Sequence, residues 1–132
     1  MSRPDLVPLL DCLTEAVPAL QAVYLFGSQV ADRLAQQSDL DLAVLAGAPL
    51  PAELSWRLAA DLGRRAGRDV DLVDLRRVDP ILGFQVVSRG EPLLVLDTHA
   101  QAAWEMTALS RYQDWKITRR AGESALLREV LG

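Results

Sequence analysis

Cysteine and histidine are scarce in this chain of 132 residues, and each scarcity excludes a kind of site. The single cysteine, Cys12, rules out an internal disulfide and favours a reducing compartment. The single histidine, His99, leaves a zinc site short of nitrogen and sulfur ligands, so we expect it at the surface or at a helix start. A net charge of −4 argues against a protein that wraps nucleic acid.

Long hydrophobic runs are also missing. No uncharged apolar stretch approaches the roughly 20 residues that cross a bilayer, and no signal peptide is visible, which predicts a cytoplasmic protein without membrane contact. Half of the residues are hydrophobic, which is enough for one buried core. We therefore expect a single domain over residues 1–132, with its core over 1–98 and a helical tail over 99–132.

The spacing of apolar residues alternates between helical and strand-like periods. It predicts helices over 4–16, 29–35, 51–66, 80–88 and 99–131, the last with a break near Gly122. It predicts strands over 22–26, 40–45, 70–75 and 93–96. Short strands separated by helices are typical of an α/β (α+β) fold, here a small sheet covered by helices. The link from Ser28 to Asp39 is short for a full crossover, so the first two strands should pair antiparallel in a mixed sheet.

A glycine turn and a pair of carboxylates stand at the centre of this pattern. Gly27 and Ser28 close the first strand, and Asp39 and Asp41 open the second. Side chains two apart on a strand point the same way, so both carboxylates can bind one cation while Leu40 faces the core. A glycine lets a phosphate approach the backbone, and a serine hydroxyl with nearby N–H groups can bind its oxygens. Either motif alone is common, but their conjunction predicts a magnesium-dependent phosphoryl-transfer site.

Phosphoryl-transfer sites often use two metal ions, and a third acidic group then binds the second ion or accepts the proton of the attacking hydroxyl. Three candidates for this group lie in or next to the strand over 70–75. Asp69 lies at the strand entry, where we expect solvent around it. Asp74 lies near the strand end and should cap the chain or pair with a following arginine. Asp71 lies inside the strand, where apolar neighbours fix its direction. We therefore predict that Asp71 completes the metal site, and that bound magnesium relieves the repulsion among the three carboxylates and stabilises the fold.

Two further features allow two interpretations each. A basic cluster suits either a triphosphate or acidic partner, or simply a solvated face, and consists of Arg64, Arg65, Arg68, Arg76 and Arg77. An apolar stripe of the tail is formed at helical spacing by Trp104, Ala108, Tyr112 and Trp115. This stripe either packs on the sheet as core or docks a helical partner or a second copy of the chain.

The residues from Leu25-Phe26-Gly27-Ser28 to Asp39-Leu40-Asp41 resemble the signature of the DNA polymerase beta–like nucleotidyltransferases. The chain length, the strand around Asp71, the helix–strand unit over 84–96 and the helical tail resemble the minimal nucleotidyltransferases (MNT) of prokaryotes. This resemblance implies a polymerase beta palm-like fold with a catalytic core over 1–98. Members of this size are often the antitoxin of a HEPN-domain ribonuclease toxin, and the resemblance implies transfer of AMP from ATP to a tyrosine of that toxin.

Our hypothesis for the site is that Asp39 and Asp41 bridge two Mg²⁺ ions and that Asp71 completes the second ion's ligands. Hard oxygen ligands suit Mg²⁺ or Mn²⁺ and disfavour Zn²⁺. The triphosphate of ATP would lie across the turn at Gly27 and Ser28. We expect loss of Asp39 or Asp41 to reduce the rate by orders of magnitude while leaving the fold intact.

One segment departs from the family pattern. Many relatives carry an arginine and then a glycine after the Gly-Ser pair, whereas this chain has Gln-Val-Ala-Asp-Arg over 29–33. Arg33 either replaces the phosphate-contacting arginine or is a surface residue.

Three functions stay open at this stage. The first is an enzyme that adenylylates a cognate toxin, in a hetero-oligomer with it or as a homodimer. The second is an antitoxin that neutralises its partner by binding alone. The third is a nucleotidyltransferase acting on a small molecule such as an antibiotic, which the lack of an acceptor-binding domain disfavours.

Overall fold

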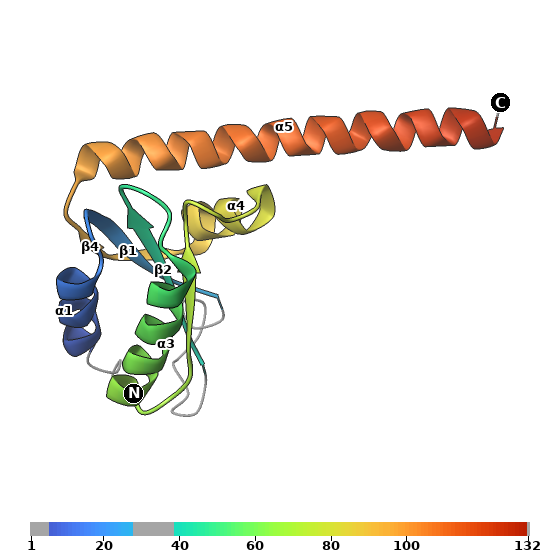
Figure 1. Ribbon diagram of the computed structural model, residues 1–132. Helices are drawn as coiled ribbons and strands as arrows, with labels where there is room; N and C mark the ends of the chain where they lie inside the picture. Colours follow the sequence, from blue (N-terminus) through green and yellow to red (C-terminus); the bar gives the residue numbers. More distant parts are fainter. Residues whose placement is uncertain (1–5, 28–38, 132) are drawn as a thin grey trace.

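The computed structural model describes residues 6–27 and 39–131, and these form a four-stranded sheet of order β3-β2-β1-β4 (Figure 1). The central strands, β1 (Leu20–Phe26) and β2 (Leu40–Ala46), pair antiparallel. At one edge β3 (Val70–Asp74) pairs parallel with β2, and at the other β4 (Glu91–Val95) pairs antiparallel with β1. The predicted mixed sheet is confirmed. The helix predicted over 29–35 lies outside the described residues.

Helices cover both faces of this sheet. One face carries α1 (Val7–Ala16) and α3 (Ala52–Ala66), and the other carries α4 (Pro80–Arg89) and α5 (Thr98–Leu131). Alternation along the strands supplies both cores, because successive side chains of a strand point to opposite faces. None of the described helices combines the length and the apolar character needed to cross a membrane.

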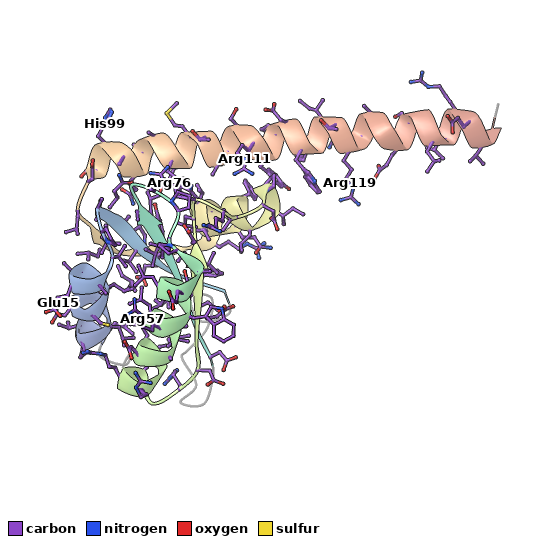
Figure 2. All side chains as sticks on the ribbon, viewed as in Figure 1. Glu15, Arg57, Arg76, His99, Arg111 and Arg119 are labelled. Carbon is purple, nitrogen blue, oxygen red and sulfur yellow. The ribbon has the colours of Figure 1, made fainter. Side chains whose placement is uncertain are left out.

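The helix ends follow local chemistry. Asp79 caps α4 by accepting a hydrogen bond from the N–H of Leu82 at 2.8 Å. Asp97 does the same for the N–H of Ala100 at the start of α5, at 2.9 Å. Gly67 ends α3 with a φ of +69°, a conformation that suits glycine. The exposed His99 points away from the sheet (Figure 2), as the sequence predicts for a surface histidine.

The predicted starts of two strands and one predicted helix break were wrong. Strand β1 begins at Leu20, two residues before the predicted start. Strand β4 begins at Glu91, earlier than predicted, because Glu91 and Pro92 pair with Leu25 and Tyr24 of β1. Proline is tolerated there because β4 is an edge strand. The predicted break near Gly122 does not occur, and α5 runs without interruption from Thr98 to Leu131.

The continuity of α5 has a local explanation. A glycine inside a helix costs about 1 kcal/mol relative to alanine, which is too little to end a long helix by itself. The ion pair between Arg119 and Glu123 spans Gly122, with 3.1 Å between Nε and Oε1. Pairs four residues apart on a helix stabilise it and offset part of this cost.

The apolar stripe of α5 is core at its beginning. Trp104 and Ala108 are buried, and the indole N–H of Trp104 donates to the carbonyl of Leu75 at 3.1 Å. Further along, the Tyr112 ring stacks on Phe84 of α4, with centroids 4.0 Å apart. Beyond these contacts α5 extends past the rest of the domain, and Figure 2 shows Arg119 on this projecting part.

Candidate active site

Two carboxylates lie side by side where β2 and β3 begin. The strands are parallel, and their register places Asp41 opposite Asp71. Leu40 and Leu42, on either side of Asp41, are buried in the core under α1 and α3. Asp41 therefore points to the opposite face, and the shared register turns Asp71 to that same face. Asp39 is exposed and precedes Asp41 by one strand period.

The three carboxylates interact electrostatically. Burial, followed by the negative charges of Asp71 and Asp39, raises the pKa of Asp41 above its ordinary value. A bound cation would reduce this repulsion and favour the ionised form of Asp41. The oxygen donors are those that Mg²⁺ prefers.

The described side chains do not form a complete set of metal ligands. Within residues 6–27 and 39–131, no three His, Cys, Asp or Glu side chains gather closely enough to hold an ion together. Repulsion between like charges favours rotamers that keep carboxylates apart. The pair formed by Asp41 and Asp71, with Asp39 one period away, fits Mg²⁺ by chemistry and register, and the shared three-carboxylate site stays a prediction.

Gly27 ends β1 next to Asp41. Its predecessor, Phe26, is paired with Asp41 across the sheet, and Gly27 has a φ of +80°. A Cβ atom on Gly27 would lie 3.2 Å from Cγ of Asp41 and would overlap the carboxylate oxygen Oδ2. Both the backbone conformation and the available space therefore require glycine. Ser28 and Arg33, the other predicted phosphate-binding residues, lie outside the described residues.

The remaining acidic candidates have other surroundings. Asp74 accepts hydrogen bonds from the N–H groups of Leu50 at 2.8 Å and Arg76 at 2.9 Å. It also pairs with Arg77, at 3.5 Å from Nε. The predicted capping and pairing of Asp74 are thus confirmed. Asp69 is exposed and precedes β3, also as predicted.

The basic cluster divides between the two ends of the sheet. Arg76 follows β3, at the end away from Asp71, where it donates to the carbonyl of Ala46 at 2.7 Å and to Gln21 at 2.8 Å (Figure 2). These bonds give Arg76 a role in joining strand ends. Other members lie at the end of α3 or just after it, close to where β3 begins: Arg64, Arg65 and Arg68. Among them, Arg64 pairs with Asp61.

Sequence reasoning missed a groove beside Asp71. Its hollows are lined by Trp56, Ala59 and Val70, and one of them reaches Asp71. Trp56 is 82% exposed although tryptophan is rarely so accessible. The signal available in the sequence was a tryptophan on the polar side of an amphipathic helix.

The comparison with protein families decides the assignment. Residues 10–99 match the family model described as polymerase beta, nucleotidyltransferase. The chain belongs to this nucleotidyltransferase family. A relative in Shewanella oneidensis, the protein adenylyltransferase MntA, is 35% identical over 113 residues, which cover 86% of this chain and 81% of MntA.

Solved structures extend the similarity to nearly the whole chain. A mutant MntA–HpeT toxin–antitoxin matches with a TM-score of 0.82 and 30% identity, over 97% of this chain and 99% of the matched one. A toxin–antitoxin with AMP-PNP matches with a TM-score of 0.79 and 33% identity, over 94% and 96%.

A third match is the MNT antitoxin complex of the tri-AMPylated Shewanella oneidensis HEPN toxin, with a TM-score of 0.75 and 32% identity, over 95% and 94%. The resemblance to MNT antitoxins and the predicted nucleotidyltransferase fold are confirmed.

Proposed function

We propose that this nucleotidyltransferase is the antitoxin of a HEPN ribonuclease toxin, and that it neutralises the toxin by transferring AMP from ATP to one of its tyrosines. The observation that carries the proposal is the pair Asp41 and Asp71, side by side next to Gly27, in a chain that matches MntA over most of its length. Support also comes from relatives solved with AMP-PNP and with an AMPylated toxin. We place the protein in the cytoplasm, because its proposed substrate is ATP and because its single cysteine is compatible with a reducing compartment.

The chain's own residues position and neutralise the reacting groups. Asp39, Asp41 and Asp71 would hold Mg²⁺, which when bound compensates the triphosphate charge and polarises the incoming hydroxyl. The phosphate tail would lie along the turn at Gly27, where the lack of a side chain leaves the Asp41 carboxylate in place. Asp71 accepts the proton of the tyrosine hydroxyl as its oxygen bonds to the α-phosphorus. The bond between the α-phosphorus and the oxygen that bridges the α- and β-phosphates breaks on the side opposite the attacking hydroxyl, and pyrophosphate leaves.

Intact mass spectrometry of a co-expressed partner tests this proposal. The partner to test is a HEPN-domain protein, sought among the products of the neighbouring genes and purified after co-expression with wild type or with an Asp39→Ala, Asp41→Ala variant. We expect one or more added AMP units with wild type and none with the variant, whose toxin should remain active. The proposal is wrong if wild type leaves the toxin mass unchanged.

The same variant addresses neutralisation by binding alone. If it protects cells as well as wild type does, contact and not AMP transfer neutralises the toxin. Labelled ATP offered together with small-molecule acceptors addresses the third function, since label on an antibiotic and none on the toxin would favour it.

A further inference from the structure

A groove follows the outer edge of β3, and we call it the β3 groove. It joins a hollow of about 670 Å³ to one of about 250 Å³, which share Trp56, Ala59 and Val70. The smaller hollow reaches Asp71, and the larger one continues to Gly63 at the end of α3. The larger hollow alone has the volume of a typical ligand site.

The outer edge of β3 is available for backbone pairing. It is an edge strand, and no other described strand pairs with its outer side. The carbonyl of Asp69 accepts from Leu40 of β2, and the N–H of Leu75 donates to Val44 of β2. Because the bonding direction alternates along a strand, Val70 directs its backbone groups outward. An extended segment can therefore add to this edge.

The walls of the groove suit a side chain of such a segment. Its helical wall has the small residues Ala59, Ala60 and Gly63 between Trp56 and Arg64, which leaves a hollow between the two larger side chains. Trp56 lines both hollows and is 82% exposed. Tryptophan dominates binding energy at many protein interfaces because it buries a large rigid surface. Trp56 is thus placed as an anchor for whatever occupies the groove.

The in-line geometry of the proposed reaction says which reactant comes from this side. In the strand order, Asp41 of β2 lies between Gly27, which directly follows β1, and Asp71 of β3. Attacking oxygen and leaving pyrophosphate lie on opposite sides of the α-phosphorus. With the phosphate tail at Gly27, the hydroxyl arrives from the side of β3.

We infer that the β3 groove docks the tyrosine-bearing segment of the protein acceptor, with Trp56 as its anchor; this inference rests on the proposed function. On a segment paired with β3, the residue beside Asp71 points to the carboxylate face, and its neighbours point toward α3 and Trp56. The acceptor tyrosine takes the first position. A flanking apolar residue takes the second and packs on Trp56.

Kinetics of AMP transfer to the HEPN partner test this inference, using Trp56→Ala and the groove-filling Ala60→Arg. Matched controls are Met106→Ala and Ala102→Arg, at exposed positions of α5. We expect both groove variants to raise the KM for the acceptor at least about tenfold. Their kcat, their affinity for AMP-PNP with Mg²⁺ and their melting temperature should stay within about twofold or a few degrees of wild type, as should all values of the controls.

Each outcome decides between the alternatives. An unchanged acceptor KM in both groove variants overturns the inference while leaving the proposed function intact. Loss of AMP-PNP affinity in Trp56→Ala also overturns it, because Trp56 would then bind the base. Failure of wild type to transfer AMP overturns the proposed function, and the inference falls with it.

Discussion

At the scale of single residues, backbone conformation and the proposed chemistry meet at Gly27. Its φ of +80° costs another residue about 1–2 kcal/mol, and a Cβ there would overlap the carboxylate of Asp41. We expect Gly27→Ala to lower AMP transfer at least about 100-fold, because displacement of a catalytic group by an ångström has effects of this size. Steady-state transfer rates and urea unfolding would measure the two effects.

Gly67→Ala is the matched control for this prediction. Gly67 also has a positive φ, of +69°, but a Cβ there would meet nothing within 4 Å. Because Gly67 also lines the far end of the β3 groove, the comparison is made at saturating acceptor, where this variant should show the backbone strain without loss of kcat. Equal loss of activity in both variants would mean that strain alone, and not the position of Asp41, explains the effect at Gly27.

The ionised Asp41 carboxylate is expected to lower the stability of the fold, although the proposed metal site needs it. Its pKa is raised in the folded protein, so the ionised form present at pH 7 destabilises the fold, and stability should rise as pH falls toward that pKa. We predict that Asp41→Asn melts about 1–4 °C higher than wild type in EDTA and transfers no AMP. Added Mg²⁺ should raise the melting temperature of wild type and leave the variant unchanged.

Differential scanning calorimetry at pH 7 and at pH 5 checks both signs. The advantage of the variant should shrink at pH 5, where more of the wild-type Asp41 carboxyl is protonated. A variant that melts below wild type in EDTA would show that the carboxylate makes stabilising contacts.

At the scale of elements, the contact between β1 and α5 is sensitive to alkaline pH. The hydroxyl of Tyr24 donates to Glu105 at 2.6 Å, and burial together with this bond raises the pKa of Tyr24 well above its ordinary value. The folded protein therefore keeps a proton that the unfolded chain loses above about pH 10, and stability falls there. We expect Tyr24→Phe to cost about 1 kcal/mol at pH 7 and less at pH 10.5.

Urea midpoints of both proteins at the two pH values measure this change. Taking the difference between them cancels groups that both share, such as Tyr112. A gap that widens at pH 10.5 would contradict the raised pKa of Tyr24.

The elements themselves were largely readable from the sequence, because periodicity reports which face of a strand or helix is buried. The direction of the Asp41 side chain followed from its buried neighbours Leu40 and Leu42. Asp71 lies beside Asp41 because β3 pairs parallel with β2 in a particular register. That register depends on the connection through α3, and it cannot be predicted from local sequence patterns. Likewise, Trp56 gains its significance from the edge of a strand more than ten residues away in sequence.

At the scale of the whole molecule, α5 projects beyond the rest of the domain (Figure 1). After Trp104, Ala108, Tyr112 and Trp115, the same face of the helix carries Leu126 and Val130, which are 61% and 72% exposed. One helix thus changes from a core element to a projecting one, and the consequences of substitution should change along it.

This change predicts unequal effects for two tryptophans. Trp104 is buried and hydrogen-bonded to Leu75, so Trp104→Ala should lower the free energy of unfolding by about 3–5 kcal/mol. Trp115 stacks on Tyr112, with centroids 5.8 Å apart, at the start of the projecting part, and Trp115→Ala should cost roughly 1 kcal/mol. Urea unfolding of the isolated chain is the measurement, because a bound partner would add its own stabilisation. Equal losses would show that the stripe is core as far as Trp115, whereas weaker toxin binding by Trp115→Ala without loss of stability would assign the projecting part to the toxin interface.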